Sequence, residues 1–419
     1  MTRRLFLLLT ILSLMFTVCV PAAFGDALPE ENPEDYGLVP SDGIEIPAFT
    51  EASMKKYDFP QITPGIEFVR KLKAGWNLGN TFDARDEGPG DPRRDYETYW
   101  SGAKTSRELI HAVAQAGFNL IRIPVSWHNH LTDDDYTIDP AWIARVEEVV
   151  GWALAEDMYV ILNIHHDNEK GYLYPDSAHY EQSEKYITAI WTQVAERFAG
   201  CDEHLIFEAM NEPRLAGTEY EWQQNPDIPE VRGAMECINR LNRIFVDTVR
   251  ASGGYNPDRF LMIPGYCGGV GSVCADAFEL PADDRLIIMV HAYTPYDFAL
   301  NMNSPDSHFD LKTDSRKKSE IAAVMNALYE RYIRHGTPVI IDEFGALYKK
   351  EGELQSRVNY AAFFTATASA RGIPVVWWDN AGFSGNGEKF GLIDRKRIEW
   401  VYPDIALAIV RNCRVNREE

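Results

Sequence analysis

Residues 205–213 read LIFEAMNEP, a short and mainly apolar run that ends in a polar cluster containing Glu212. Short continuous runs of Val, Ile, Leu and Phe are typical of parallel strands that are buried on both faces. Runs of this kind recur along the chain and give eight candidate strands, at residues 74–78, 119–123, 159–164, 205–209, 260–263, 286–290, 338–341 and 373–377.

Amphipathic stretches typical of helices separate these runs, at residues 106–116, 141–155, 184–198, 231–251, 320–335 and 354–370, and a last one follows at residues 406–413. Strands that alternate with helices predict the α/β class. Eight such units predict a single (β/α)8 TIM barrel. An open, doubly wound sheet is the alternative fold, but no GxGxxG sequence follows the first candidate strand.

The first 60 residues lie outside this pattern. Arg3 and Arg4 precede an apolar run at residues 5–20, and small residues follow, which is typical of a secretory signal peptide. The run is short for a membrane-spanning helix. We therefore expect residues 1–25 to be removed and the protein to be secreted without a membrane span. A retained membrane anchor and a lipoprotein modified at Cys19 are the alternatives.

Residues 26–60 are rich in Pro, Asp and Glu and show no periodicity, which predicts a flexible acidic lead-in or linker. Residues 61–419 then form one domain. With 63 acidic against 41 basic residues, the chain has a net charge of −22. Such a surface repels nucleic acid and anionic lipid, and it suits a neutral substrate, although solubility alone also explains it. We expect a monomer.

Cysteine and histidine spacing gives no support to a metal site. No CxxC pair occurs, so a zinc ribbon is not indicated, while Cys267 and Cys274 are close enough in sequence to bridge a loop. His165 and His166 are neighbours, and neighbouring residues on a strand point to opposite faces. Metal hydrolases use HxH or HExxH spacing instead. We therefore expect no metal and no cofactor.

Polar and aromatic residues gather at the ends of the candidate strands, where TIM barrels place their active residues. Glu212 follows the fourth strand and Glu343 the seventh, and these two strands face each other across an eight-stranded barrel. Two carboxylates that flank a bond are what glycoside hydrolysis requires, and a retaining enzyme holds them roughly 5–5.5 Å apart. Other polar residues at strand ends are Asn80, Arg122, His165, His166, Asn211, His291, Tyr293 and Trp378.

Two of these positions, Arg122 and Trp378, leave alternatives open. Arg122 fits an ion pair that holds the barrel together, and it also fits a cation that keeps Glu343 ionised. Of Trp377 and Trp378, one should face the barrel mouth, where an indole suits the face of a sugar ring. Further aromatic residues in or near loops are candidates for the lining of a cleft, namely Trp100, Trp127, Tyr172, Tyr174, Trp222, Tyr296 and Phe383.

Seven segments together resemble glycoside hydrolase family 5, and most closely its bacterial endo-β-1,4-glucanase branch. They span Gly75 to Asp394 and read GWNLGNTFDA (75–84), FNLIRIPVSW (118–127), VILNIHHD (160–167), IFEAMNEP (206–213), VHAYTPYDF (290–298), VIIDEFGA (339–346) and VVWWDNAGFSGNGEKFGLID (375–394). The resemblance implies that residues 61–419 are the catalytic domain of an enzyme that cleaves cellulose-like β-glucan with retention, by double displacement.

The resemblance also implies the roles of single residues. Glu212 is expected to be the general acid/base and Glu343 the nucleophile. Asn211 is expected to contact the sugar 2-hydroxyl, and Trp378 to form a platform under the cleaved sugar. The residues expected to support the nucleophile are Arg122, His291 and Tyr293. Those expected to bind the substrate are Asn80, His165 and His166.

Other functions stay open at this point. Within the same family, the loops are compatible with a xyloglucanase, a mixed-linkage glucanase (lichenase) or a mannanase. A metal-dependent barrel hydrolase that uses His165, His166 and His291 belongs to a different class. A barrel that binds sugar without catalysis is the third possibility, and the intact pair of glutamates argues against it.

Overall fold

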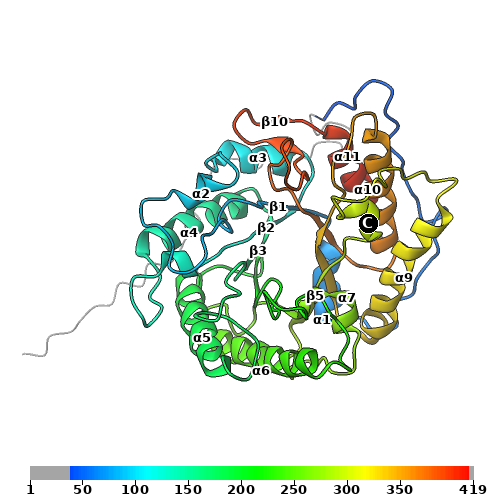
Figure 1. Cartoon of the computed structure of the whole chain (residues 1–419). Coiled ribbons are helices and arrows are strands. Elements are labelled where there is room, and N and C mark those ends of the chain that lie inside the picture. Colours follow the sequence, from blue (N-terminus) through cyan, green and yellow to red (C-terminus); the bar gives the residue numbers. More distant parts are fainter. Residues whose placement is uncertain (1–37, 415–419) are drawn as a thin grey trace, which may run out of the picture.

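A computed structural model describes residues 38–414 and shows a closed barrel of eight parallel strands (Figure 1). Each strand pairs with the next one in the chain, and β8 closes the barrel on β1, where Ala74 lies opposite Val375. All eight candidate strands are present, as β1 (Ala74–Asn77), β2 (Leu120–Ile123), β3 (Tyr159–Asn163), β4 (Leu205–Glu208), β5 (Leu261–Gly269), β6 (Leu286–His291), β7 (Val339–Phe344) and β8 (Val375–Trp377). The predicted (β/α)8 TIM barrel is confirmed.

Helices surround the strands as an outer ring (Figure 1). The large ones are α3 (Arg107–Gln115), α4 (Pro140–Ala155), α5 (Tyr180–Arg197), α6 (Pro229–Ala251), α9 (Ser315–Arg331), α10 (Leu354–Ser369) and α11 (Pro403–Asn412). Smaller elements are α1 (Pro64–Lys71), α2 (Tyr96–Tyr99), α7 (Val270–Val273), α8 (Tyr296–Ala299), the 3-10 turns His128–His130 and Ile333–His335, and the strand pair β9 (Ile393–Asp394) and β10 (Glu399–Trp400).

Local sequence sets the helix ends. At the start of α4, the Asp139 side chain accepts a hydrogen bond from the amide of Ala141, and Pro140 occupies the first helical position, where its missing N–H costs nothing. The helix expected at residues 320–335 differs from the prediction. It begins earlier, at Ser315, and gives way after Arg331 to the 3-10 turn, which Gly336 ends with a φ of 84°.

The barrel interior changes from apolar to polar along its axis. At the amino-terminal end of the strands, α1 closes the barrel with Phe68, whose ring stacks on Phe260 at 4.0 Å between centroids. A layer of aliphatic side chains such as Ile161 and Ile206 follows. Two residues further along five of the strands, the inward positions are polar and buried, as Asn77, Arg122, Asn163, Glu208 and Asp342. This polar layer lies directly under the carboxyl ends of the strands.

The described part of the lead-in, residues 38–60, contains no helix or strand but is held against the barrel. Ser41 donates its amide and its hydroxyl to the two oxygens of Asp404 on α11, both at 2.8 Å. The Phe49 amide donates to Asn412, also at 2.8 Å, and the Phe49 ring packs against Phe363 of α10. Where a flexible lead-in was expected, residues 38–60 thus make specific contacts with α10 and α11.

Two other expectations concern the chain ends and the cysteines. The expected signal peptide, residues 1–25, lies outside the described residues. Within residues 38–414, no helix combines the length and the apolar character that a bilayer crossing requires. Cys267 and Cys274 are free thiols, so the disulfide considered between them is not present.

Candidate active site

Glu212 and Glu343 meet at the carboxyl ends of the strands, with His291 between them. His291 Nδ1 lies 2.8 Å from Oε1 of Glu212, and Nε2 of the same ring lies 3.5 Å from Oε1 of Glu343. One carboxylate oxygen of each glutamate and one His291 nitrogen all lie within 4.8 Å of one another. An oxygen–oxygen separation below this limit is compatible with the short distance of roughly 5–5.5 Å between the two carboxyl groups of retaining glycosidases, and not with the longer one of roughly 6.5–9.5 Å in inverting enzymes. The two predicted carboxylates are therefore close enough to act on one bond.

Arg122 connects the polar layer of the barrel to Glu343. Its Nε and Nη2 donate to both oxygens of Glu208, at 2.6 and 2.8 Å. Nη2 also donates to Asn211 at 2.7 Å, while Nη1 donates to Glu343 at 2.8 Å and to Asn77 at 3.1 Å. The guanidinium of Arg122 therefore links side chains of β2 and β4, and it also donates to Glu343.

Two hydrogen-bond donors converge on the carboxyl oxygens of Glu343. Arg122 donates to Oε1, and the Tyr293 hydroxyl donates to Oε2 at 3.0 Å. Although burial opposes a charge on Arg122, the carboxylate of Glu208 helps to raise the pKa of the guanidinium well above its ordinary value. Burial and the charge of Glu343 raise the pKa of Tyr293 well above 10, so that its hydroxyl remains a donor.

Asp342 and His291 balance the charge around this network. Burial and the charge of Glu208 raise the pKa of Asp342 well above its ordinary value, which favours the neutral form of its carboxyl group. Burial alone would lower the pKa of His291, but the charge of Glu343 and the hydrogen bond with Glu212 raise it to about 9. Two cations, Arg122 and His291, therefore face the carboxylates of Glu208, Glu212 and Glu343.

Glu212 shares a proton with His291. Burial raises the pKa of Glu212, but the hydrogen bond and charge of His291 and the charge of Arg214 lower it to about 2. Because the pKa of His291 is raised to about 9, the pair holds one proton between these two pH values, mainly on His291. The proton that an acid/base residue needs is thus available across a contact of 2.8 Å.

The protonation of His165 follows from its neighbours. The Val125 amide donates to Oδ1 of Asn163, which fixes the orientation of that side-chain amide. Nδ2 of Asn163 then donates to Nδ1 of His165 at 3.0 Å. Burial lowers the pKa of His165 well below its ordinary value, so the ring is neutral and carries its proton on Nε2. His165 is therefore a neutral hydrogen-bond donor.

Trp378, rather than Trp377, faces the site. The Trp377 ring is fully buried, and its Nε1 donates to the carbonyl of Phe390 at 3.0 Å. The Trp378 ring lies parallel to His165, with 5.6 Å between the ring centroids, and packs in one cluster with Tyr293 and Phe390. The structure thus places Trp378 between His165 and Tyr293, whose hydroxyl donates to Glu343.

Asn80 and His166 flank Asp83, a residue that the sequence did not single out. Asn80 has a φ of 58°, a left-handed conformation that asparagine tolerates better than most residues, and its amide donates to Asp83 at 3.0 Å. Burial raises the pKa of Asp83 to about 6. His166 Nε2 lies 3.9 Å from Oδ2 of Asp83, and burial with the charge of Arg85 lowers the pKa of His166 to about 3.

The three histidines proposed as metal ligands in the alternative function do not converge. Among residues 38–414, His165 and His166 group with Asp83, whereas His291 groups with Glu212 and Glu343. The first group is already hydrogen-bonded, because Asp83 accepts from the amides at positions 80 and 81 and His165 Nδ1 accepts from Asn163. This donor set does not fit a metal centre shared by the three histidines.

Burial separates the aromatic residues that were candidates for the cleft lining. Trp127 and Tyr174 are buried and belong to the core. Trp100, Trp222 and Tyr296 are 40%, 58% and 61% exposed. Trp100 also lies near His166, with 5.7 Å between the ring centroids. These three remain candidates for contacts with a long chain.

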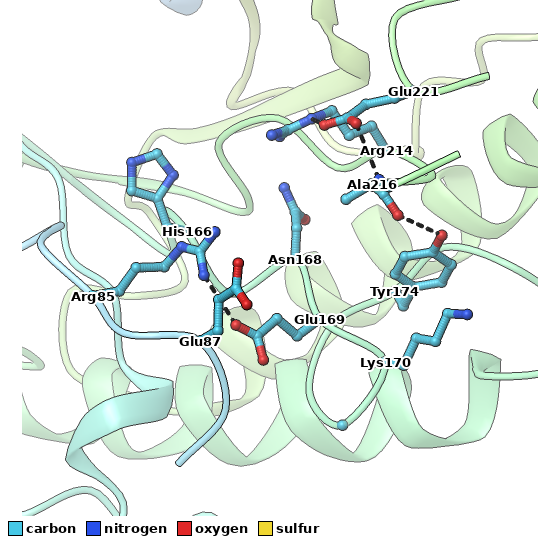
Figure 2. Close-up of a pocket in the computed structure, with 12 residues that line it drawn as sticks. Arg85, Glu87, His166, Asn168, Glu169, Lys170, Tyr174, Arg214, Ala216 and Glu221 are labelled. Carbon is cyan, nitrogen blue, oxygen red and sulfur yellow. Dashed lines mark hydrogen bonds and ion pairs between the residues drawn. The ribbon is translucent and has the colours of Figure 1, made fainter. Parts of the chain in front are cut away.

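A pocket of about 540 Å³ adjoins Glu212, and we call it the side pocket (Figure 2). The loops that follow β1, β3 and β4 form it. Asn168 and Arg214 join it to the acid/base candidate, because both donate to the backbone carbonyl of Glu212, at 2.7 and 3.0 Å. Its lining residues are Arg85, Glu87, His166, Asn168, Glu169, Lys170, Gly171, Tyr174, Arg214, Ala216, Gly217 and Glu221.

The chain matches known proteins over most of its length. A family model described as cellulase (glycosyl hydrolase family 5) matches residues 85–384. The chain belongs to glycosyl hydrolase family 5. As a member of this family it is a glycoside hydrolase of the cellulase type, which confirms the resemblance noted in the sequence.

Relatives in glycosyl hydrolase family 5 include proteins with different named substrates. The chain is 44% identical over 351 residues to endoglucanase 1 of Ruminococcus albus, a match that covers 83% of this chain and 81% of the relative. A family 5 lichenase from Caldicellulosiruptor sp. F32 is 48% identical with a TM-score of 0.84, covering 88% of this chain and all of its own. A xyloglucan-specific endo-β-1,4-glucanase from a metagenomic library is 36% identical with a TM-score of 0.75, covering 83% of this chain and 98% of its own.

Sequence reasoning missed the polar layer beneath the glutamates, in particular Glu208 and Asp342. A signal for them exists in the strands themselves. Asn163 and Glu208 are paired across β3 and β4, and Arg122 occupies the same face of β2. A basic residue and acidic residues on the inward faces of strands that are otherwise apolar indicate a buried ion pair. The side pocket has no comparable signal, because loops form it.

Proposed function

We propose that the protein hydrolyses β-1,4-glucosidic bonds within cellulose-like β-glucan chains, with Glu343 as the nucleophile and Glu212 as the acid/base. The observation that carries this proposal is the convergence of the two carboxylates on His291, with Arg122 and Tyr293 donating to Glu343. Family 5 membership accounts for retention of configuration and for the endo-acting mode on β-glucan.

In the first step, a carboxylate oxygen of Glu343 forms a bond to the anomeric carbon while the bond to the leaving oxygen breaks, and Glu212 protonates that oxygen. As Glu343 bonds to the sugar, its negative charge disappears. This charge is one reason why the pKa of His291 is raised. The proton on His291 therefore becomes easier to transfer to Glu212 at the moment when the leaving group needs it.

In the second step, water replaces the sugar on Glu343. Glu212 has lost its proton and accepts one from the attacking water, and the returning charge on Glu343 again favours a protonated His291. Asn211 lies next to Glu212, and Arg122 holds its side-chain oxygen, so that its NH2 group is left to donate to the sugar 2-hydroxyl. Trp378, His165, His166 and Asn80 bind the sugar that is cleaved.

The proposal is tested by the first product formed from a β-glucan. Proton NMR during the first minutes of hydrolysis should show the β-anomer of the new reducing end before mutarotation, and products should be a mixture of internal fragments. Initial formation of the α-anomer would contradict the double displacement. Rates on carboxymethylcellulose, lichenan, xyloglucan and glucomannan would separate the glucanase from the xyloglucanase, lichenase and mannanase alternatives.

We propose in addition that the protein is secreted as a monomer after cleavage of residues 1–25. The amino-terminal pattern of two arginines, an apolar run and small residues supports this. Mass spectrometry of the secreted protein should give a mature chain that begins at Asp26, and light scattering should give the mass of one chain. A chain retained in the membrane, or a stable dimer, would contradict the respective part of this proposal.

A further inference from the structure

We infer that the side pocket binds a neutral sugar side chain carried by a branched β-1,4-glucan, such as a xylosyl branch. This inference rests on the proposed function, because it assigns a second contact to the same substrate. Arg214, which lines the side pocket, lies 3.5 Å from Oε2 of Glu212, so the pocket is next to the cleavage point that the proposed function assigns. Its volume of about 540 Å³ falls within the range of about 300–1,000 Å³ that small-molecule sites occupy.

Two ion pairs from different loops line opposite sides of the side pocket (Figure 2). On one side, Arg85 contacts Oε1 of Glu169 at 3.0 Å, and the Gly88 amide donates to Oε2 at 2.9 Å. On the other side, Arg214 contacts Oε1 of Glu221 at 3.0 Å, and the backbone amide at position 217 donates to Oε2, also at 3.0 Å. Each carboxylate is thus fixed by one arginine and one backbone amide.

This arrangement suits hydroxyl groups. A carboxylate oxygen that already accepts one hydrogen bond can accept another, and an arginine that uses part of its five N–H groups can donate more. The four paired side chains are between 16% and 30% exposed, so they remain accessible from the pocket. Because their geometry is set before a ligand arrives, little conformational entropy is lost on binding.

The charge of the side pocket indicates that its ligand is neutral. Three basic side chains, Arg85, Lys170 and Arg214, are matched by three acidic ones, Glu87, Glu169 and Glu221. A pocket for an anionic sugar or a phosphate would carry an excess of basic groups. Paired acids and bases fit a ligand that both donates and accepts hydrogen bonds, as sugar hydroxyls do.

The position of the side pocket indicates a branch rather than the main chain. Trp378 lies under the sugar that is cleaved, His165 lies against Trp378, and the His165 and His166 rings are 4.4 Å apart. His166 in turn forms part of the pocket lining. The two histidines thus stand between the platform and the side pocket. When a platform covers the face of a glucose ring, the ring edges point sideways, and a substituent on C6 would extend toward the pocket.

Filling the side pocket tests this inference. Gly171 lines it, and a Cβ built on this glycine meets no atom within 4 Å. A series of Gly171→Ala, Gly171→Leu and Gly171→Trp adds volume in steps without altering any residue placed in the catalytic machinery. Gly151→Trp is the matched control, because Gly151 is an exposed residue of α4 with the same open space around its Cβ.

We expect kcat/KM on xyloglucan to fall with each added step, by about tenfold or more in Gly171→Trp, while kcat/KM on unbranched lichenan stays within about twofold of the parent. Gly151→Trp should leave both substrates unaffected, and thermal melting should show that every variant is folded. An equal loss on both substrates would make the pocket part of the main-chain site and overturn the inference. No loss on either substrate, or a parent protein that cleaves lichenan but not xyloglucan, would overturn it as well. A parent protein that cleaves none of the β-glucans would instead contradict the proposed function.

Discussion

Replacement of His291 by asparagine tests whether the His291–Glu212 pair stores the catalytic proton. Asparagine keeps a side-chain donor near Oε1 of Glu212, where Nδ1 of the histidine lies at 2.8 Å, but it cannot carry the proton. In the parent protein the pKa of His291 is about 9, so the pair loses its proton only above that pH. In the variant, Glu212 must hold the proton alone. Without the charge of His291, the pKa of Glu212 should rise from about 2 to the ordinary value or, with burial, to roughly 5.

The magnitude follows from the fraction of protonated acid. A carboxyl group with a pKa of roughly 5 is protonated in only about 1% of molecules at pH 7 and in about half of them at pH 5. For His291→Asn we therefore expect kcat/KM to fall about 100-fold at pH 7 but only about twofold at pH 5, because this parameter reports ionisation in the free enzyme.

The assay is the pH dependence of kcat/KM on lichenan between pH 4 and 10. The alkaline limb, near pH 9 in the parent, should move to roughly pH 5 in His291→Asn. His204→Asn is the control, since His204 is a surface histidine paired with Asp202 and should leave the profile unchanged. A His291→Asn variant that loses activity equally at all pH values, or keeps its alkaline limb near pH 9, would refute the claim that the His291–Glu212 pair stores the catalytic proton.

Three further predictions concern stability and metals. Arg122→Met leaves the buried carboxylates of Glu208 and Glu343 without their cation, so the free energy of unfolding measured in urea should fall by about 3–5 kcal/mol, and an unchanged value would contradict the network. Asp404→Ala removes both hydrogen bonds from Ser41, so we expect the free energy of unfolding to fall by about 1–3 kcal/mol while kcat on lichenan stays unchanged. A fall in kcat as well would show that the lead-in affects the active site. Excess chelator should leave the rate on lichenan unchanged, whereas inactivation that added metal reverses would favour the metal-dependent alternative.

The fold was predictable because the strands of a parallel barrel are buried on both faces and therefore read as continuous apolar runs. The exception is β5, whose predicted end at Ile263 falls short of the observed end at Gly269. The additional residues, Pro264 to Gly269, are not a run of large apolar side chains, and the register with β6 shifts within them. Periodicity does not reveal a strand of this kind.

The site was predictable where position along a strand determines it. Glu212 follows β4 and Glu343 lies near the carboxyl end of β7, and closure of the barrel brings them together. Glu208 and Asp342 lie earlier on the same strands, and their function as partners of Arg122 depends on which neighbouring strand faces them. That relation is set by the register between strands, which a single sequence does not state.

Loops account for what the sequence left open. The side pocket combines three loops that are far apart in sequence, and the contacts of residues 38–60 with α10 and α11 join segments more than 300 residues apart. No local pattern of apolar and polar residues encodes such contacts. For the same reason, the sequence alone does not decide between unbranched and branched glucan.

The most direct test of the catalytic assignment is covalent labelling with a 2-deoxy-2-fluoro-β-cellobioside that carries a good leaving group. The fluorine slows the second step, so that the glycosyl-enzyme accumulates and can be located by peptide mass spectrometry. The account predicts one label for each chain, on Glu343, and none on the Glu343→Gln variant. A label on Glu212 or on any other residue, or the absence of a covalent intermediate in protein that is fully active on β-glucan, would contradict it.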